Sequence, residues 1–566
     1  MENSMNESRE NPGLEKCAQI PEVNGNAAPQ EAAAVRSGEE TAGNTPVPAG
    51  QPEVRRPPVG DASRFAQYGI YSLFYAALFA LGVYRNPGGI AITVPVAAFF
   101  LMFGEMRKRA GGKVFAAASG AGTAMQRFLA VSAVLLSVNV WTSASTSLQT
   151  LDKLGIILLT AVFLLRCRAD ERDWDPGRYL EGIAAVIFRP LVKLPRPLQD
   201  FGAFLKKKKK DGEAGHAASA VAKGLVIAVP LLIVAVGLLA GADSVFENML
   251  DGLFENLEIP ELAADVAEIL FLAAAGLAAF YTFASEYSGT GRADEERNSG
   301  KKQGDPVTAI TFTLPLTAVY MVFCGIQAVY LTGGRSLPEG ISYWEYAHAG
   351  FYQLAAVCAL NFVLVVFCEV RYRRHRILTA LLVAVTLCTY IMIASSAARM
   401  IMYVRAYDLT FLRLFVLWFL VVLSVWLGAV LAGILRGGMP VFRFCLAAGT
   451  VLYLLFAFAH PDYWIAKYNI AAAEQRTGGN AGISADAGPE YGAVSAEEIA
   501  ANLDWNYLCG TLSDDAVPAL KGNRALLERR EEYHKEERRP GEEKSFAEYA
   551  RTWNLSEFLA ERSPAD

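Results

Sequence analysis

The stretch "LTALLVAVTLCTYIMIASSAARMIMYVRAYDLTFLRLFVLWFLVVLSVWLGAVLAGIL", residues 378–435, decides the fold class. It holds two long apolar runs that flank a short segment with Arg399, Arg405, Asp408 and Arg413. Each run is long enough to cross about 30 Å of hydrocarbon as an α-helix, and a charged side chain inside a bilayer is costly. The runs therefore predict two membrane helices, and the charges between them mark either a wet loop or a site beside the membrane.

The same apolar pattern recurs along the whole chain. Of its 566 residues, 53% are hydrophobic and only 19% are charged, whereas soluble proteins carry about a quarter charged residues. Apolar runs predict about eleven membrane helices, at residues 65–84, 88–104, 125–142, 152–167, 219–240, 263–285, 307–331, 351–369, 378–398, 410–435 and 441–459. The predicted fold class is therefore all-α, a polytopic transmembrane helix bundle.

The composition of the remaining segments predicts how the chain is organised outside the membrane helices. Residues 1–62 are rich in proline, glycine, alanine and glutamate, which predicts a disordered cytoplasmic tail without a cleavable signal peptide. The other predicted segments are helices one to four at 63–167, a basic cytoplasmic connector at 168–218, helices five to eleven at 219–459, a flexible linker at 460–494 and an extracytoplasmic helical tail at 495–566. Apolar residues predict that this tail docks at the outer face; they are Leu503, Trp505, Tyr507, Leu508, Leu512, Val517 and Leu520.

Lysine and arginine collect on one side of this eleven-helix arrangement. They lie in the loops at 105–113, 369–376 and 435–443 and in the connector that ends with Lys206–Lys210. The loop at 241–265, on the opposite side, has seven acidic residues and neither lysine nor arginine. Because positively charged loops stay in the cytoplasm, the sequence predicts a cytoplasmic N-terminus and an extracytoplasmic C-terminus.

The connector combines basic and apolar residues in "FRPLVKLPRPLQDFGAFLKKKKK", residues 188–210. Proline at positions 190, 195 and 197 interrupts any long helix there. Such a segment either lies on the anionic inner leaflet, where each cation contributes about 1 kcal/mol, or is a solvated loop that only fixes the topology. The sequence leaves both interpretations open.

Motifs of soluble enzymes are absent from the sequence. The eight cysteines form no CxxC pair and the five histidines form no HExxH pair, so a zinc site is not expected. There is also no P-loop, no GxGxxG between a strand and a helix, and no GxSxG elbow. The sequence therefore predicts no metal, no cofactor and no nucleic-acid partner. The expected partners are membrane lipids and an anionic small molecule or lipid headgroup.

Several stretches on the predicted outer side carry a family resemblance. In chain order they are "ADSVF" (242–246), "FCGIQAVYLTGG" (323–334), "YWEYAHAGFYQLAAVCALN" (343–361), "SSAARMIMYVRAYDLTFLRL" (395–414), "HPDYWIAKYN" (460–469) and "DWNYLCGTLSDDAVPAL" (504–520). Together they resemble an uncharacterised family of bacterial multipass membrane proteins, the neighbouring domain-of-unknown-function groups forty-one fifty-three and forty-one seventy-three.

This resemblance extends from residue 125 to the end of the chain. One departure is Asp408, at a position where the family pattern has glycine. The resemblance implies an integral protein of a bacterial cell (inner) membrane, and it implies no established activity.

The arginines of residues 395–414 are the centre of a candidate ligand-binding site. Arg399 and Tyr403 are four residues apart and share a helix face. Arg413 lies in the first turn of the next helix, where the helix dipole disfavours a cation. Asp408 and Thr410 are both suitable N-cap residues for that helix, and Asp408 is expected to be engaged in capping. A tight turn would bring both arginines to one depth, where their guanidinium groups suit a carboxylate or a phosphate.

Three further polar residues belong to the same candidate site. Gln353 and Asn361 are eight residues apart and are expected to share one helix face, and Glu345 precedes that helix. Simpler explanations stay open for each group. The arginines would then snorkel to lipid phosphates, the amides would only tie helices together, and the nearby aromatic residues would form an interfacial belt.

Three functional hypotheses fit these patterns. The first is a membrane protein that binds or transports an anionic or polar envelope component at an outward-facing site. The second is a non-catalytic sensor or scaffold whose outer tail meets a partner. The third is a membrane enzyme for a lipid-linked substrate with Glu345, His348 or Asp462 as acid or base, but the outer acidic residues are scattered rather than paired.

Overall fold

The computed structural model describes residues 60–112, 115, 123–168, 176–208, 261–289, 304–332, 350–437, 439–480, 503–521, 524–537 and 546–562. These residues are helical apart from turns and one isolated bridge between Gly304 and Tyr372. The longer helices are α1 (Ala62–Val83), α2 (Thr93–Arg109), α3 (Thr123–Thr142), α4 (Thr146–Arg168), α5 (Pro176–Val192), α6 (Arg196–Lys208), α9 (Glu261–Tyr287), α10 (Pro306–Thr332), α12 (Phe351–Arg371), α13 (Arg376–Tyr407), α14 (Phe411–Arg436), α15 (Val441–Phe458) and α16 (Pro461–Asn480).

Ten of the described helices are long and apolar enough to cross a membrane. They are α1, α2 with the preceding turn η1 (Ile90–Ile92), α3, α4, α9, α10, α12, α13, α14 and α15. Their positions confirm ten of the predicted runs, and the predicted run at 219–240 lies outside the described residues. The protein is a multipass helical membrane protein.

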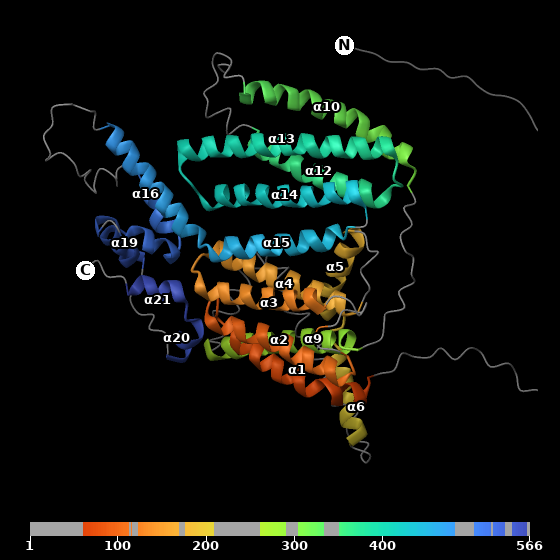
Figure 1. The fold of residues 1–566 in the computed structure, drawn as a ribbon. Helices are drawn as coiled ribbons and strands as arrows, with labels where there is room; N and C mark the ends of the chain where they lie inside the picture. Colours follow the sequence, from red (N-terminus) through yellow and green to blue (C-terminus); the bar gives the residue numbers. More distant parts are fainter. Residues whose placement is uncertain are drawn as a thin grey trace, which may run out of the picture. The chain divides into compact units, whose positions relative to one another are not determined.

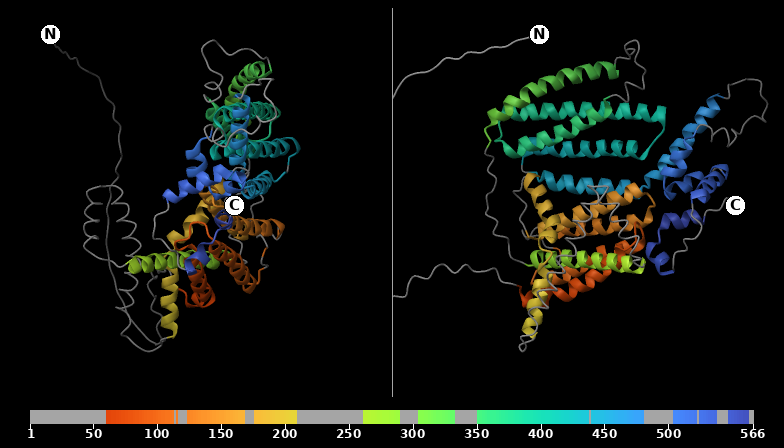
Figure 2. Two further views of the ribbon diagram at one scale, coloured as in Figure 1. Left: turned by 90° about the vertical axis from the view of Figure 1, so that its left-hand side faces the viewer. Right: turned by 180° about the vertical axis from the view of Figure 1, so that it is seen from behind.

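The spanning helices pack in two groups with α15 between them (Figures 1 and 2). Helices α1–α4 and α9 share one buried core, which includes Phe103, Leu129 and Tyr281. Helices α10 and α12–α14 share another, which includes Cys358 and Val385. Helix α15 contacts α14 of the second group and α3 of the first.

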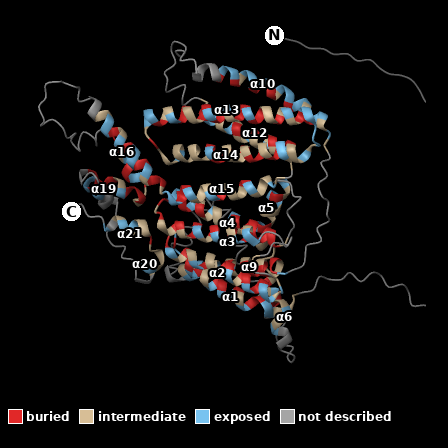
Figure 3. Ribbon diagram, viewed as in Figure 1, coloured by how far each residue is buried: buried red, intermediate tan, exposed pale blue. Residues whose placement is uncertain are grey.

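Large apolar side chains also cover the outside of the spanning helices. Ile70, Leu101, Val322 and Leu435 are each more than half exposed. Buried and exposed residues alternate along α1 and α13 (Figure 3). An exposed apolar surface of this extent marks a contact with another apolar phase, which for spanning helices is the lipid.

The ends of the spanning helices define two faces of the bundle. On the first, here called the basic face, Arg168 at the end of α4 donates a hydrogen bond to the backbone carbonyl of Glu286 at the end of α9 (3.2 Å). On the second, here called the tail face, the α1–α2 loop, the α3–α4 loop and the α15–α16 turn contact residues 503–562, the C-terminal segment. Figure 1 shows α16 and the C-terminal segment at one end of the spanning helices, and α5 and α6 at the other.

The C-terminal segment is a series of short helices packed on the tail face. They are the π-helical turn η3 (Asn506–Thr511), η4 (Asp514–Ala516), α18 (Val517–Leu520), α19 (Arg524–Glu537), α20 (Phe546–Thr552) and α21 (Leu555–Glu561). Leu503, Leu508, Leu512, Val517 and Leu520 are buried in the core that α10 and α12–α14 share. The prediction of a docked, helical tail is confirmed for the described residues.

Two segments are more helical than the sequence predicts. Helix α16 occupies the first part of the predicted linker, because Ile465, Ala466 and Ile470 are buried on one side of it. Helix α5 continues past Pro190 to Val192, so the expected interruption of the connector falls between α5 and α6.

Candidate functional site

Arg413 closes the turn between α13 and α14. Its guanidinium donates to the carbonyl oxygens of Tyr407 and Asp408, where α13 ends, and lies 4.4 Å from the ring centre of Tyr403. The last carbonyl groups of a helix lack partners within the helix and carry partial negative charge. Arg413 therefore offsets its unfavourable position at the start of α14 by capping the end of α13.

Asp408 does not cap α14, and the prediction was wrong on this point. Its carboxylate instead pairs with Arg476 of α16, whose Nη1 donates to Oδ2 of Asp408 (3.4 Å). The residue before α14 is Thr410, whose side chain makes no capping bond. Asp408 has a φ of 64°, in the left-handed region that glycine adopts most readily. This conformation fits the glycine of the family pattern at the same position.

Arg399 lies deeper than the sequence predicts. Helix α13 continues from Arg399 to Tyr407, which is roughly 12 Å of helix, so Arg399 and Arg413 do not share one depth. Arg399 is 8% exposed, and its Nη2 donates to Oε1 of Gln327 in α10 (3.2 Å). The hydroxyl of Ser395 donates to the same oxygen (2.8 Å). A Cβ on Gly350, the residue before α12, would lie 3.6 Å from Nη1 of Arg399.

Asn361 ties three spanning helices together. It is fully buried in α12, accepts a hydrogen bond from the hydroxyl of Tyr320 in α10 (2.7 Å) and donates one to the hydroxyl of Thr389 in α13 (3.0 Å). Gln353 is exposed on the same helix. The expected common face is therefore wrong, because eight residues turn a helix by about 80° beyond whole turns. Glu345 lies outside the described residues.

The five predicted site residues that the structure describes thus fall into separate places. Tyr403 and Arg413 meet at the end of α13. Arg399 lies farther along that helix, beside α10 and the start of α12. Asn361 has the interhelical role that was the simpler explanation for it.

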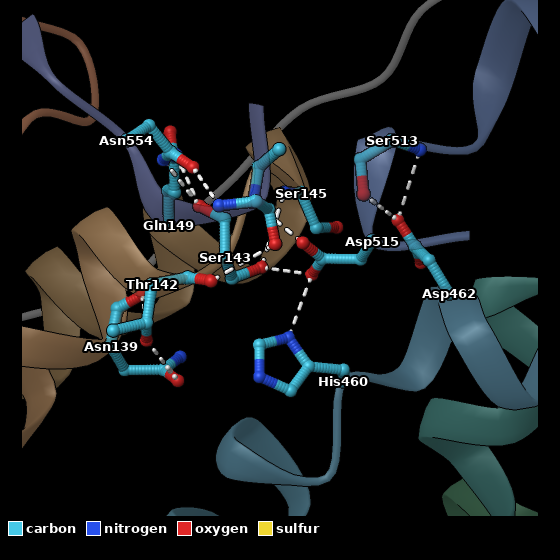
Figure 4. Close-up of polar contacts among 12 residues, drawn as sticks. Asn139, Thr142, Ser143, Ser145, Gln149, His460, Asp462, Ser513, Asp515 and Asn554 are labelled. Carbon is cyan, nitrogen blue, oxygen red and sulfur yellow. Dashed lines mark hydrogen bonds and ion pairs between the residues drawn. The ribbon is translucent and has the colours of Figure 1, made fainter. Parts of the chain in front are cut away.

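A second polar cluster, here called the His460 cluster, lies on the tail face (Figure 4). At its centre is Asp515 of η4, whose side chain is fully buried. Its Oδ2 accepts a hydrogen bond from the hydroxyl of Ser143 (2.5 Å) and lies 3.2 Å from Nδ1 of His460. Its Oδ1 accepts a hydrogen bond from the backbone N–H of Ala144 (2.9 Å). The cluster joins the α3–α4 loop, the α15–α16 turn and the C-terminal segment.

Asp462 and Asn554 extend the His460 cluster (Figure 4). Asp462, in the first turn of α16, is 3% exposed, and one of its oxygens accepts from both the N–H (3.2 Å) and the hydroxyl (2.6 Å) of Ser513. The side-chain amides of Asn554 (2.9 Å) and Gln149 (2.8 Å) both donate to the carbonyl of Ser143. The loop after α3 therefore obtains hydrogen-bond partners from a segment near the end of the chain.

A buried carboxylate lies near this cluster, within the spanning helices. Asp152 of α4 is fully buried and accepts hydrogen bonds from Asn139 of α3 (2.8 Å) and from the hydroxyl of Tyr453 in α15 (2.8 Å). The predicted apolar run begins at residue 152, whereas α4 begins at Thr146. Asp152 therefore lies inside the helix, where it links α15 to the first group of helices.

Three titratable groups of the His460 cluster have shifted pKa values. The hydrogen bond with Asp515, together with the charges of Asp515 and Asp462, raises the pKa of His460 against the opposing effect of burial. Burial raises the pKa of Asp462 by more than the hydrogen bonds from Ser513 lower it. Burial also acts to raise the pKa of Asp515, but hydrogen bonds, including those from His460 and Ser143, lower it overall.

The geometry of the His460 cluster suits attachment rather than nucleophilic catalysis. The hydroxyl of Ser143 donates to Asp515, so it is not directed at the His460 ring as a serine nucleophile would be directed at its base. His460 has a φ of 51°, and a non-glycine residue in this region carries a strain of about 1–3 kcal/mol. The cluster attaches the C-terminal segment to the α3–α4 loop and the α15–α16 turn.

Sequence reasoning missed the His460 cluster because its members are far apart along the chain. Ser143 and Asp515 are 372 positions apart. The available signal was the pair of motifs "HPDYWIAKYN" and "DWNYLCGTLSDDAVPAL", in which acidic residues accompany a histidine and two serine or threonine hydroxyls. Neither motif contains information on which other segment it meets.

Comparison with known protein families matches residues 130–522 to Domain of unknown function (DUF4153). The chain belongs to this family. The matched region contains Arg399, Asp152 and most of the His460 cluster, whereas Asn554 lies beyond it. The resemblance drawn from the sequence motifs is thereby confirmed. No curated protein and no solved structure matches the chain.

Proposed function

We propose that this DUF4153-family protein lies in a bacterial cell membrane and binds or transports an anionic or polar envelope component at its tail face. The collection of lysine and arginine on the basic face supports a cytoplasmic position for that face. The tail face is then extracytoplasmic. The binding role rests on one observation, the buried Arg399 beside the start of α12.

Two sources of positive potential meet at Arg399. One is its guanidinium, which Gln327 and Ser395 hold in place through a shared oxygen. The other is the start of α12 at Gly350, which has no side chain to cap the first N–H groups. Such N–H groups attract anions, and a guanidinium binds a carboxylate or phosphate through two parallel hydrogen bonds. An anion held between them is the ligand that this arrangement favours.

Substitution of Arg399 by lysine is expected to remove this ligand while the charge is kept. A lysine still reaches toward lipid phosphate but lacks the two parallel donors, so bound anions should fall by about tenfold, as expected for a loss of about 1.4 kcal/mol. The measurement is mass spectrometry of the molecules that copurify with wild-type protein and with Arg399→Lys. Arg413→Lys is the matched control, because Arg413 caps α13. Unchanged copurifying anions in Arg399→Lys would refute the binding proposal.

The His460 cluster favours a second candidate function, that of a sensor or scaffold that presents its C-terminal segment outside the membrane. Asp515 places a buried carboxylate between this segment and the α3–α4 loop. The attachment includes His460, and histidine is the side-chain type whose ordinary pKa lies near neutrality. Release of the segment would then report on the protonation state of the exterior.

Docking of the C-terminal segment is expected to weaken as the pH rises through the raised pKa values of Asp462 and His460. His460 has a raised pKa, so its contribution is complete below about pH 6.5 and is lost as the pH rises through that raised pKa. Asp462 also has a raised pKa, so its contribution is complete below about pH 4 and is lost as the pH rises through that raised pKa. Asp515 has a lowered pKa, so its contribution is present above about pH 4 and is lost only as the pH falls through that lowered pKa.

Limited proteolysis of residues 503–562 measures this docking directly. Cleavage should be faster at about pH 8.5 than at about pH 5.5, after correction for the intrinsic pH dependence of the protease on an unfolded substrate. The difference should shrink in His460→Gln, which cannot titrate in this range. Slower cleavage at the higher pH would contradict the sensor function.

A further inference from the structure

Helices α5 and α6 run across the ends of the spanning helices at the basic face. In both Figure 1 and the right-hand view of Figure 2 they lie at a steep angle to the neighbouring spans. Helix α5 contacts α4, α9 and α12, and α6 contacts α1 and α9. Neither is among the helices that are long and apolar enough to cross a membrane. Their position is that of helices lying along a membrane surface.

Both helices expose apolar side chains on the side away from the bundle. On α5, Phe188, Leu191 and Val192 are 59%, 67% and 78% exposed, whereas Tyr179 packs with its ring stacked on Phe442 of α15 at 3.8 Å between centroids. On α6, Leu205 is exposed, whereas the partly exposed Phe201 also packs on Phe65 of α1 (4.9 Å between ring centroids). A helix with one apolar side and one basic side lies in the interface of a bilayer with the apolar side in the acyl region.

The basic side of this pair is concentrated around one carboxylate. Arg189 of α5, Lys193 immediately after α5 and Arg196 of α6 all pair with Glu286 at the end of α9. The Glu286 side chain is 6% exposed, whereas the three cations are 32%, 33% and 33% exposed. One buried acid thus orients three cations that still reach the solvent.

Positive charge exceeds negative charge in this cluster. The charges of Arg64 and Arg168 also repel that of Lys193. A second carboxylate, that of Asp200, accepts hydrogen bonds from Arg64 (3.4 Å) and from the hydroxyl of Tyr281 (2.7 Å). Asp61 also pairs with Arg64 (3.6 Å), so five cations minus three carboxylates leave a surplus of two positive charges. Burial, followed by Arg196, Arg189, Arg168 and Arg64, lowers the pKa of Lys193 to about 8. A bound anion would relieve this repulsion.

We propose that α5 and α6 form a membrane-surface element that binds the phosphate of anionic phospholipids between Arg189, Lys193 and Arg196, with the apolar side of α5 among the acyl chains. The complementarity is twofold, because the same two helices present the surplus of cations and the exposed apolar residues. A soluble phosphate would use the cations alone. This site is on the face opposite to Arg399 and does not depend on the proposed function there.

The test compares melting temperatures of the full-length protein in detergent with added phosphatidylglycerol, phosphatidylcholine or glycerol phosphate. A ligand that binds only the folded state raises the melting temperature. Phosphatidylglycerol should raise it more than phosphatidylcholine does. The double variant Arg189→Gln/Arg196→Gln should lose at least half of that difference, and it leaves Lys193 to pair with Glu286. The matched control is Arg109→Gln/Arg371→Gln, which removes two exposed cations elsewhere on the basic face.

Three outcomes would overturn the proposal: equal shifts with both lipids, an equal loss in the control variant, or a shift with glycerol phosphate as large as that with phosphatidylglycerol.

A second measurement locates α5 without a change of charge at the cluster. A fluorescent probe on Leu191→Cys should be quenched by spin-labelled acyl chains in phosphatidylglycerol-containing liposomes. The same probe on Lys108→Cys, an exposed position at the end of α2 on the basic face, should be quenched much less. The seven described cysteines are buried, and Cys17 is replaced by serine in both proteins. Equal quenching at the two positions would show that the apolar side of α5 does not enter the bilayer.

Discussion

Asp515→Ala is expected to release the C-terminal segment from the tail face. The substitution removes the acceptor of the Ser143 hydroxyl and of the Ala144 N–H, together with the partner of His460. Removal of one partner of a buried charged pair costs about 3–5 kcal/mol, a large fraction of the stability of any local unit. Hydrogen exchange in residues 503–537 should therefore show a strong loss of protection.

Asp504→Ala is the matched control for this experiment, in the same segment. Asp504 is exposed, and its carboxylate accepts a hydrogen bond from the backbone N–H of Tyr507 (3.1 Å). Loss of such a local cap costs about 1 kcal/mol, so the control should keep most of its protection. If both variants lose protection to the same extent, the buried carboxylate is not what attaches the segment.

Gly89→Val is expected to displace the last two helices, α20 and α21. Gly89 lies in the α1–α2 loop, and a Cβ there would fall 2.3 Å from Cα of Thr552 and 2.6 Å from the carbonyl oxygen of Arg551. These are backbone atoms, which cannot rotate away as a side chain would. Overpacking of a close contact costs about 1–3 kcal/mol even where side chains can adjust, so we expect the contact to open.

Hydrogen exchange in residues 546–562 and the melting temperature measure this effect. Gly289→Val is the control, because no heavy atom lies within 4 Å of a Cβ at Gly289. It should leave both quantities unchanged. Retained protection of residues 546–562 in Gly89→Val would mean that the α1–α2 loop, rather than the C-terminal segment, absorbs the added volume.

The spanning helices are predictable from the sequence because their length and apolar character are local properties. The run that contains Arg399 shows where this reasoning ends. Its apolar part stops near residue 398, yet α13 continues to Tyr407, because Arg399 donates a hydrogen bond to Gln327, 72 positions away. A helix boundary that depends on a distant partner is not encoded in the run itself.

The candidate site is predictable only where its contacts are local. The unfavourable position of Arg413 at the start of α14 indicates that it has a partner, and that partner is the end of the neighbouring helix. The sequence does not distinguish such a carbonyl group from a ligand. Asp408 illustrates the opposite case. Its position before α14 made a capping role plausible, but the sequence does not indicate the pairing with Arg476 that the structure shows.

The attachment of the C-terminal segment has a consequence for the order in which the protein can mature. Ser143 and Gly88 obtain partners from Asp515 and Asn554, which follow them by 372 and 466 positions. At a synthesis rate of about 5–20 residues per second, the first of these gaps lasts roughly 20 to 75 seconds. During that time the early loops bind water or a helper protein in place of their final partners. A ribosome that stops before Asp515 leaves these loops open, so their closure distinguishes a finished chain from a truncated one.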